Sequence, residues 1–414
     1  MIDSNSHMEL RKFVSLAKGK PPAQIPYYGP GAEPYLTPEY LRTNSIAEMA
    51  KASVNSVKVG IGDTIILWDG SNAGEVLRGK AGILASTMTH VSHSGQFDGN
   101  YFFYALKSHE PYLKSQTAGS GIPHVDKELL GKIQILNCLP EEQSKIAEIL
   151  NTVDQVIEQT EAIIGKQQRI KIGLMQDLLT KGIDKHGNIR SEETHEFKDS
   201  PLGRIPVEWD VEPAVKLCDA VIDCKNRTPP ETQEGHPVIR TPNVRDGEFK
   251  YEELLFTGHF SYNIWTARGK PRPGDVVITR EAPFGEACLI PNDIPEACLG
   301  QRMMMYQANP DLLCNEYLVY TICSERVQAH LLELAGGSTV GHIRVGDIRN
   351  LLIPHPKDTK EQQRISDILR AASKSIDDYV NQLSKFISLK TALMQDLLTG
   401  DVSVANLLDE QSAI

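Results

Sequence analysis

The side chains that could contact nucleic-acid bases are grouped in a few short stretches of this 414-residue chain. Arginine, lysine, asparagine and glutamine donate hydrogen bonds to base edges, and other basic residues bind phosphate oxygens. Three stretches of the second half are dense in such side chains: Lys225-Asn226-Arg227-Thr228, Arg240-Thr241-Pro242-Asn243 with Arg245, and Arg268, Lys270 and Arg272. Arg280 and the pair Gln301-Arg302 follow turn signals and extend this set. The pattern indicates loops that can enter the major groove of DNA.

A second, sparser set of candidate contact residues lies in the first half of the chain. Its members are Lys18, Lys20, Tyr27, Tyr28, Trp68, Ser71, Asn72, His90, His93 and Ser94. For any single member, a solvated surface charge or an aromatic ring at the edge of the core is the simpler interpretation. As a set, these residues favour a DNA-contacting surface.

Catalytic motifs are missing from the sequence. The string nearest to the Asn/Asp-Pro-Pro-aromatic cluster of a methyltransferase, Asn309-Pro310-Asp311-Leu312, lacks the second proline and the aromatic residue. Gly269-Lys270 lacks the upstream glycine and the hydroxyl residue of a P-loop. No cysteine or carboxylate beside His90 and His93 completes a metal site. The residues therefore predict a binding protein without catalytic residues, metal or cofactor.

The chain is acidic overall, with a formal net charge of −11. A protein that binds polyanions indiscriminately is usually basic, so any DNA-contacting surface must be local. Residues 10–125 carry 11 Lys and Arg against 8 Asp and Glu, whereas residues 212–345 carry 13 against 18. The 7 cysteines have no C-x-x-C spacing, and no leader or long apolar run is visible. These features predict a cytoplasmic protein with reduced thiols.

One heptapeptide occurs twice in the chain. The sequence from Leu174 to Thr180 returns letter for letter 219 positions later, from Leu393 to Thr399. The same spacing relates Glu142-Gln143 to Glu361-Gln362, and farther upstream the register slips by one, so that Leu130 aligns with Ile348. Because this period is too long for a solenoid, we expect two large halves that each end in the same element.

The repeated segments carry apolar residues at alternate spacings of three and four, which is typical of heptad helices. The first series is Ile146, Ile149, Val153, Val156, Ile163, Ile170 and Leu174, and the second is Ile365, Ile368, Ala372, Ile376, Tyr379, Leu383, Phe386 and Leu393. A helix over residues 141–179 would form a rod of roughly 60 Å. The two copies are expected to pair antiparallel as a coiled coil; the alternative is that each packs only on its own module.

The segments before the helices are rich in glycine, proline and short β-like runs. Residues 57–68 indicate two strands joined by a turn, and residues 274–279 repeat that pattern. We therefore predict an α+β protein in which two divergent α/β modules are separated by two long helices. The boundaries are 10–121 for the first module, 122–183 for the first helical segment, 184–202 for a polar linker, 203–340 for the second module and 341–402 for the second helical segment.

Two functions of different classes remain open from the residues alone. The first is a DNA-binding protein that reads sequence without catalysis, which the clustered Arg and Lys residues favour. The second is a structural coiled-coil adaptor that spaces two protein-binding modules without DNA contact, which the negative charge favours. An enzyme with an unrecognised site has less support, because no spacing indicates a nucleophile, an acid–base pair or a metal.

Several motifs together resemble the DNA-specificity (S) subunit of type I restriction-modification systems. They are the helices ending in Leu-Met-Gln-Asp-Leu-Leu-Thr, the helix opening from Pro356 to Gln362, and the phrase Leu202-Gly203-x-Ile205-Pro206-x-x-Trp209. The resemblance covers residues 10–402. It implies that 10–121 and 203–340 are target recognition domains, each reading one half of a split site in double-stranded DNA. It also implies two methyltransferase (M) subunits and restriction/translocation (R) subunits as partners, which carry out methylation and cleavage.

Overall fold

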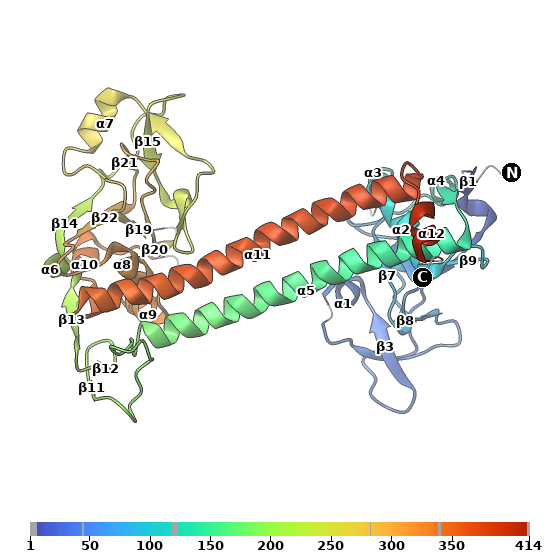
Figure 1. The fold of residues 1–414 in the computed structure, drawn as a ribbon, viewed down its shortest axis with the longest axis horizontal. Helices are drawn as coiled ribbons and strands as arrows, with labels where there is room; N and C mark the ends of the chain where they lie inside the picture. Colours follow the sequence, from blue (N-terminus) through green and yellow to red (C-terminus); the bar gives the residue numbers. More distant parts are fainter. Residues whose placement is uncertain (1–5, 44, 118–122, 282, 338–340, 412–414) are drawn as a thin grey trace. The chain divides into compact units, whose positions relative to one another are not determined.

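The computed structural model describes residues 6–43, 45–117, 123–281, 283–337 and 341–411 (Figure 1). The chain divides into two compact units, Met1–Ala162 with Val380–Ile414, and Ile163–Tyr379. Each unit contains one α/β module, the beginning of the long helix that follows this module, and the end of the other long helix.

The first module is built on a four-stranded antiparallel sheet with the order β2-β9-β6-β7. A second sheet has the order β4-β3-β8-β5, in which β3 and β8 are parallel. Strand β6 is buried along its whole length, as its apolar sequence predicts for a central strand. The strands are β2 Val14–Lys18, β3 Ala32–Leu36, β4 Met49–Lys51, β5 Lys58–Val59, β6 Thr64–Leu67, β7 Val76–Arg78, β8 Gly82–Leu84 and β9 Met88–His93.

The second module repeats this arrangement. Its main antiparallel sheet has the order β14-β22-β19-β20, and its smaller sheet, β18-β15-β21, again contains one parallel pair, β15 with β21. The matching strand orders confirm the expected internal repeat. The strands are β14 Cys218–Asp223, β15 His236–Ile239, the hairpin β16 Val244–Arg245 and β17 Glu248–Phe249, β18 Leu255–Thr257, β19 Val276–Arg280, β20 Phe284–Leu289, β21 Cys298–Leu299 and β22 Met303–Ala308.

Short helices pack against the main sheet of each module. Helix α2 contacts β6 and β7, and helix α8 contacts β19 and β20 in the same way. The Asp98 carboxylate begins α2 by accepting hydrogen bonds from the backbone N–H groups of Asn100 and Tyr101, both at 2.9 Å. The helices are α1 Pro38–Thr43, α2 Gly99–Ser108, α3 Glu110–Ser115, α4 Lys127–Gly131, α6 Ala214–Leu217, α7 His259–Trp265, α8 Asn315–Ile322, α9 Glu325–Leu334, α10 Val345–Arg349 and α12 Ala405–Gln411.

Each module also has a strand pair next to its long helix. Strand β1 (Ser6–Glu9) pairs antiparallel with β10 (Gln134–Asn137), and β13 (Trp209–Pro213) pairs antiparallel with β23 (Leu352–Pro356). In the register of the repeat, Asn137 and His355 occupy equivalent positions of β10 and β23.

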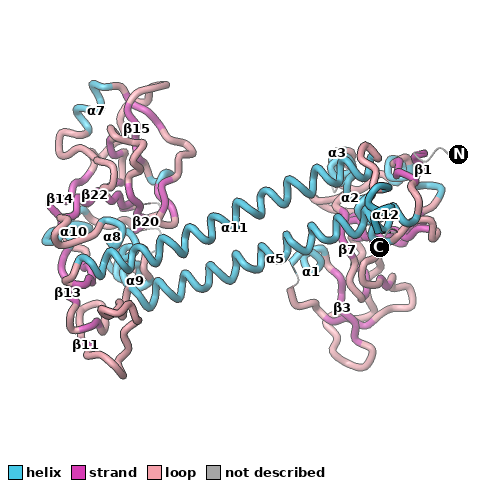
Figure 2. The backbone as a smooth tube through the Cα atoms, viewed as in Figure 1, coloured by secondary structure: helices cyan, strands magenta, loops and turns pink. Residues whose placement is uncertain are grey.

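The two predicted long helices are present as α5 (Pro140–Leu178) and α11 (Thr359–Thr399) (Figure 2). In the first unit, Leu397 and Leu398 at the end of α11 share a core with Ile146 near the start of α5. In the second unit, Leu178 at the end of α5 shares a core with Ile365 near the start of α11. The beginning of each helix therefore lies with the end of the other, and the expected antiparallel arrangement is confirmed.

The repeated glutamine explains part of the sequence repeat. The Gln143 side-chain oxygen accepts the Asp98 N–H at 2.8 Å, and its amide donates to the carbonyls of Gln96 and Cys138. The Gln362 side-chain oxygen accepts the Cys314 N–H at 2.8 Å, and its amide donates to two carbonyls near β23 and α8. Both glutamines are almost fully buried. Each one joins the start of a long helix to the residue that precedes a module helix, α2 in the first module and α8 in the second.

The repeated glutamate behaves differently in the two copies. Glu361 is buried and forms a bidentate ion pair with Arg190, at 2.5 and 2.9 Å. It also accepts hydrogen bonds from the Trp209 indole and the Ile183 backbone. Burial opposes the charged form of Arg190, but Glu361 raises its pKa. Glu142 is half-buried and accepts one hydrogen bond from the backbone N–H of Leu139, at 2.9 Å.

The segment between the two halves is folded onto the second unit. Arg190 lies within the predicted linker and is only 6% exposed. Strand β11 (Phe197–Lys198) pairs with β12 (Ile205–Pro206), and Asp184 closes a turn by accepting the N–H groups of His186 and Asn188. All seven cysteines of the chain are free. Among the described helices, none is long and apolar enough to cross a membrane.

Candidate nucleic-acid interface

The basic residues after the first strand of each main sheet occupy equivalent places. In the first module, the N–H of Gly19, the residue after Lys18, donates to the Met88 carbonyl at 2.9 Å. In the second module, the Cys224 N–H donates to the Met303 carbonyl at 3.2 Å in the same position of the sheet. Lys20 in one module and Lys225 in the other therefore correspond. These two lysines therefore lie at corresponding ends of the two main sheets.

Helix α7 brings two of the predicted stretches of the second module together. The Lys225 ammonium lies 5.1 Å, and the Arg227 guanidinium 5.3 Å, from the centre of the Trp265 ring. The Trp265 indole N–H donates to the Arg227 carbonyl at 2.9 Å. On the loop after α7, Arg268 pairs with Asp223 at 2.5 Å. The chain thereby forms one basic and aromatic surface from residues 225–228 and 265–270.

Lys270 and Arg272 continue this loop. The Lys270 ammonium lies 5.6 Å from the centre of the Tyr262 ring. The backbone N–H of Arg272 donates to the Asp275 carboxylate at 2.9 Å, which fixes the turn into β19. Asn226 and Arg227 are exposed.

Three further predicted residues adjoin this surface from the sheet side. The Gln301 N–H donates to the Thr228 hydroxyl at 3.4 Å, and the Arg280 N–H donates to the Arg302 carbonyl at 2.8 Å. Gln301 and Arg302 are exposed, whereas the Arg280 side chain is half-buried and donates to the Ile343 carbonyl. The loops 225–228, 268–272 and 300–302 therefore form one continuous region of the second module.

The predicted stretch from Arg240 to Arg245 has a structural role. Asn243 is fully buried; its side-chain oxygen accepts the Arg240 N–H, and its amide donates to the carbonyls of Lys250 and Glu252. The Arg240 guanidinium donates to the Glu253 carbonyl at 2.6 Å, and Thr241 lies in the short 3-10 helix η2 (Thr241–Asn243). Arg245 faces Glu286 at 4.0 Å. Asn243 has no free hydrogen-bonding group for a base.

In the first module, Trp68, Ser71 and Asn72 lie in the loop after β6. The Trp68 N–H donates to the Thr87 carbonyl at 2.8 Å, which matches the bond from Arg280 to Arg302 in the second module. Ser71 and Asn72 are exposed. This loop therefore lies at the same end of the sheet as Lys18.

The two predicted tyrosines lie in a separate loop before β3. The Tyr27 hydroxyl donates to the Pro30 carbonyl at 3.2 Å, and its ring lies 5.4 Å from the Lys51 ammonium. Tyr28 is 77% exposed and could stack on another group.

The two histidines of strand β9 are not brought to this end of the sheet. His93 packs its ring against Phe97 and Phe102, and burial lowers its pKa. Val14, at the start of β2, pairs with His93, so His93 and Ser94 lie at the opposite end from Lys18. His90 lies 3.4 Å from the Asp63 carboxylate. Across the described residues, no group of three or more potential ligands could hold a metal ion.

Other polar residues on the same surface were missed from the sequence. Exposed Arg344 begins α10, and no described carboxylate forms an ion pair with it. Arg349 lies 3.7 Å from Asp223. His124 and His342, both exposed, follow the one-residue slip of the repeat and could have been found by extending the alignment from Leu130 toward the N-terminus.

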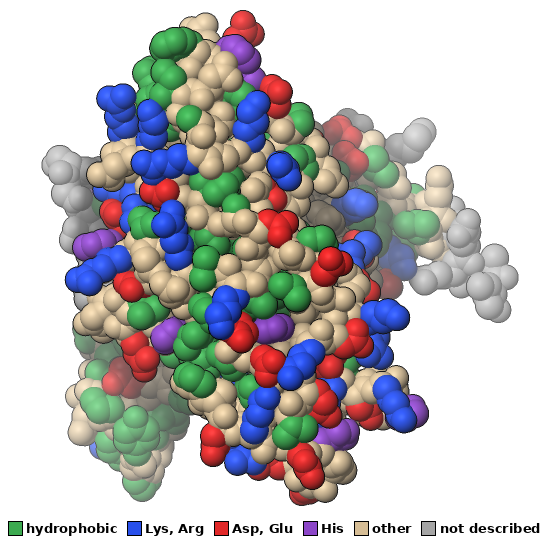
Figure 3. All heavy atoms as spheres, turned by 90° about the vertical axis from the view of Figure 1, so that its left-hand side faces the viewer, with side chains coloured by type: hydrophobic (Ala, Val, Ile, Leu, Met, Phe, Trp, Pro, Cys, Tyr) green, Lys and Arg blue, Asp and Glu red, His purple; other side chains and the backbone are tan. Residues whose placement is uncertain are grey.

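Positive and negative side chains are interspersed on one face of the second module. Lys and Arg side chains are separated by Asp and Glu over the face that carries α6, β14 and α10 (Figure 3). This distribution agrees with the acidic balance of residues 212–345. Favourable contacts with phosphates would therefore be local, and sequence-independent attraction would be modest.

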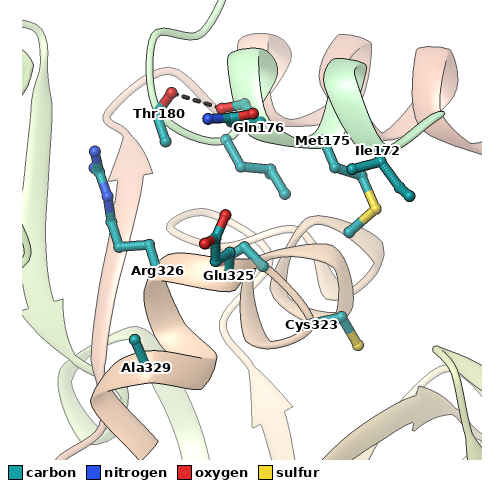
Figure 4. A pocket seen from close by; sticks show the side chains of 10 residues that line it. Ile172, Met175, Gln176, Thr180, Cys323, Glu325, Arg326 and Ala329 are labelled. Atoms are coloured by element: carbon teal, nitrogen blue, oxygen red, sulfur yellow. Dashed lines mark hydrogen bonds between the residues drawn. The ribbon is translucent and has the colours of Figure 1, made fainter. Parts of the chain in front are cut away.

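A groove of about 560 Å³ lies between the end of α5 and helix α9 in the second unit (Figure 4). Met175 and Leu179 of the repeated heptapeptide line it with apolar surface, and Arg326 lines it from α9. The Arg326 guanidinium donates to the Arg204 carbonyl at 3.1 Å, has one buried nitrogen without a hydrogen bond, and forms no ion pair with a described carboxylate. Burial lowers its pKa. An apolar floor therefore adjoins an unneutralised cation.

The sequence and fold place the chain in a known family. The family model described as the type I restriction modification DNA specificity domain matches residues 5–168 and again residues 225–387. The chain is a member of the DNA-specificity subunits of type I restriction-modification systems. The two matches contain the two modules with parts of their long helices, so the family repeat and the structural repeat coincide.

Individual relatives support the same assignment. The chain is 33% identical to the type I restriction enzyme MjaVIII specificity subunit of Methanocaldococcus jannaschii over 405 residues, which cover 95% of this chain and 92% of that protein. It is 19% identical over 351 residues to the type I restriction enzyme EcoBI specificity subunit of Escherichia coli, covering 77% and 72% of the two chains.

Solved structures share the fold. The S subunit from M. genitalium superposes with a TM-score of 0.59 at 13% sequence identity, covering 95% of this chain and 96% of that one. A chain from a study of complex assembly and conformational transition of the type I R-M system gives a TM-score of 0.58 at 16% identity, covering 97% and 99%. At these identities the likeness supports the fold alone.

Proposed function

We propose that this specificity subunit recognises a bipartite DNA sequence, with one module on each half, and holds the methyltransferase and restriction subunits of a type I complex. The observation that carries this proposal is the equivalence of the two candidate surfaces. Each lies at the same end of a repeated sheet, next to the loop after its first strand. Two copies of one surface in a single chain favour a split site.

The subunit itself is non-catalytic in this proposal. Its sequence has no cofactor turn, P-loop or nucleophile arrangement, so methylation and cleavage are assigned to M and R subunits. Methylation of a base within a duplex requires the base to be flipped out, and the specificity subunit need only grip the flanking DNA. A modest affinity of the isolated subunit is compatible with this division, and agrees with the mixed charge of the second module.

The helices offer a surface for the partner subunits. Apolar side chains are exposed along them, including Ile172 at 66% in the second unit and Ile387 and Leu389 at 48% in the first. Exposed apolar residues along one element are typical of a protein interaction site. The groove beside Arg326 adds apolar surface and a cation, which would suit an amphipathic segment of a methyltransferase subunit with an acidic side chain.

The docking part of the proposal can be tested by co-purification with the methyltransferase subunit. Met175→Lys and Arg326→Glu should each weaken retention of that subunit, because they place charge in the apolar floor or reverse the cation. Glu333→Lys on the same helix α9 is the control, since its side chain is 81% exposed and does not line the groove. Equal retention by all three variants would contradict docking at this groove.

The long helices would set the spacing of the two half-sites. Half-sites lie on one face of a duplex when their centres are about one helical turn, roughly 34 Å, apart. Removing four residues from α5 and four from α11 at equivalent positions should shorten the tolerated spacer without changing either half-site. Changed half-sites with an unchanged spacer would contradict this role.

The main experiment is sequencing of fragments bound from a random DNA pool by the chain with its methyltransferase subunit, at two salt concentrations. Two conserved half-sites with a fixed gap, and affinity that falls steeply with salt, would support the proposal, because phosphate contacts release counterions. An intact complex that recovers no motif would favour the structural adaptor instead.

A further inference from the structure

Each module contains an isolated β-bridge that joins an acidic residue to a histidine. The pairs are Asp69 with His124 and Glu281 with His342. Both bridges follow the same backbone pattern: Val125 N–H donates to the Trp68 carbonyl and Ile343 N–H to the Arg280 carbonyl, each at 3.0 Å. The two bridges therefore occupy equivalent places, directly after β6 and β19. Both histidines are exposed.

Each acidic residue of a bridge also holds a cation. The Lys18 ammonium lies 2.7 Å from the Asp69 carboxylate, with side-chain exposures of 47% and 30%. The Arg302 guanidinium lies 3.0 Å from the Glu281 carboxylate, with exposures of 45% and 31%. The same trio of cation, carboxylate and histidine is therefore present in both modules, at closely similar exposure.

The cation comes from a different strand in each module. Lys18 ends β2, and the equivalent residue at the end of β14 is Asp223, which pairs with Arg268 instead. Arg302 precedes β22, and the equivalent residue before β9 is Thr87. Duplication of one module alone would place both cations at the same position. The recurrence of the trio with an exchanged cation therefore calls for a shared role.

The backbone of the second module supports such a role. Arg302 has a φ of 72°, in the left-handed region that residues other than glycine rarely adopt. The Arg280 N–H donates to the Arg302 carbonyl and holds this conformation. The Arg302 Nε lies 3.0 Å from the Glu281 carboxylate. Among the described residues, the terminal nitrogens of the Arg302 guanidinium form no hydrogen bond or ion pair, and the side chain is 45% exposed.

We propose that these two trios are the corresponding base-contact centres of the two modules. Lys18 and Arg302 are specificity-determining residues, and Asp69 and Glu281 are positioning residues that hold them. A guanidinium fixed through Nε can place its terminal nitrogens on O6 and N7 of a guanine, and a lysine can donate to the same acceptors. His124 and His342 flank the contact. This inference rests on the proposed bipartite DNA recognition and names the residues at its centre.

The test uses the same selection from a random DNA pool, with the full chain and its methyltransferase subunit. Arg302→Ala and Glu281→Gln should relax the preference at one guanine of one half-site by about 5- to 150-fold and leave the other half-site unchanged. Lys18→Ala and Asp69→Asn should do the same in the other half-site. Arg302→Lys should keep part of the preference, because a lysine can still donate to O6 and N7 of guanine.

Matched controls come from ion pairs of similar exposure away from the trios. Glu33→Gln disrupts the ion pair of Glu33, which is 31% exposed, with Lys58, which is 59% exposed. Glu248→Gln disrupts the ion pair of Glu248 with Lys250. Both controls should retain the wild-type motif. Thermal melting of every variant should stay close to wild type, because exposed ion pairs contribute little to stability.

The outcomes separate this inference from the proposed function. If the wild-type complex selects no split motif, the proposed function fails. If the wild type selects a split motif and the trio variants select the same motif, the base-contact role is overturned while the proposed function stands. Uniformly weaker binding with unchanged base preferences would also overturn it, since that result indicates phosphate contacts only.

Discussion

Glu142 and Glu361 are equivalent in the sequence repeat, but their surroundings predict different contributions to stability. Glu361 and Arg190 are 5% and 6% exposed, and Glu361 also accepts hydrogen bonds from Trp209 and Ile183. Glu361→Gln would leave the buried guanidinium with only the half-exposed Glu208, 3.9 Å from its Nε, as a neighbouring carboxylate. Removing one partner of a buried pair costs about 3–5 kcal/mol, so we expect the second unit to lose that much stability.

Glu142→Gln is the control inside the same protein. Glu142 accepts one hydrogen bond from the Leu139 backbone, and no described cation pairs with it. A single hydrogen bond contributes about 0.5–1.5 kcal/mol, and glutamine can still accept it, so the expected loss is at most about 1 kcal/mol. The two substitutions are chemically identical, and only the surroundings of the side chain differ.

Hydrogen exchange of backbone amides in each unit, followed through urea unfolding, would measure both effects. Exchange in β13 and β23 should accelerate strongly in Glu361→Gln, whereas exchange in β1 and β10 should change little in Glu142→Gln. The double variant Arg190→Met with Glu361→Gln should recover part of the loss, because no unpaired charge remains. Losses within about 1 kcal/mol of each other in the two single variants would refute the reasoning.

Three further predictions concern the same elements. Gln143→Leu and Gln362→Leu should destabilise their own units by similar amounts, about 2–4 kcal/mol for three lost hydrogen bonds, and urea midpoints that differ widely would contradict this. Asp154→Asn removes the 2.6 Å pair with Lys390 and should lower stability of the first unit alone, by about 1 kcal/mol in the same assay. Burial lowers the pKa of His355, so the unfolded chain binds a proton that the folded chain does not, and stability should fall as pH drops below about 6.5. His355→Asn should remove this acid-side loss, and equal urea midpoint shifts between about pH 7.5 and pH 5.5 in variant and wild type would exclude it.

The architecture could be predicted from the sequence because it rests on long-range patterns. The exact repeat and the heptad spacing predicted two long helices, and α5 begins and ends within one residue of the expected helix over 141–179. The modules were expected to be divergent copies from a few shared landmarks. Their matching strand orders could not be read from those landmarks, since pairing depends on contacts between residues far apart in the chain.

The start of the first module shows the limit of judging short segments by sequence alone. Residues 1–8 resemble an expression tag in part and would be set aside on that ground. Residues 6–8 lie in β1, which pairs with β10 as β13 pairs with β23. These three residues belong to the fold, and the sequence gives no local signal of this because the partner strand lies more than a hundred residues away.

The candidate contact residues could be predicted only in part. Residue type identified the loops near Lys225 and Arg268, and helix α7 brings them together through Trp265. Residue type could not separate Asn243, whose amide is used inside a turn, from an asparagine free to contact a base. It also gave no weight to Glu281, since an acidic residue is not an obvious DNA contact until its bound arginine is seen. These distinctions depend on hydrogen-bond partners, which the sequence does not specify.

The exchange of helix ends explains why the heptapeptide is identical while the modules differ. Leu178 packs in the core of the second unit, and its copy Leu397 packs in the core of the first. Each copy must therefore fit the module that lies beyond the other helix, against Ile365 in one unit and Ile146 in the other. A substitution in one copy would have to fit only the core into which that copy packs. Both cores, however, include the same repeated helix start, with Ile146 in one and Ile365 in the other. Similar packing sites favour identical heptapeptides, whereas the sheets and loops that carry the candidate base contacts are free to diverge.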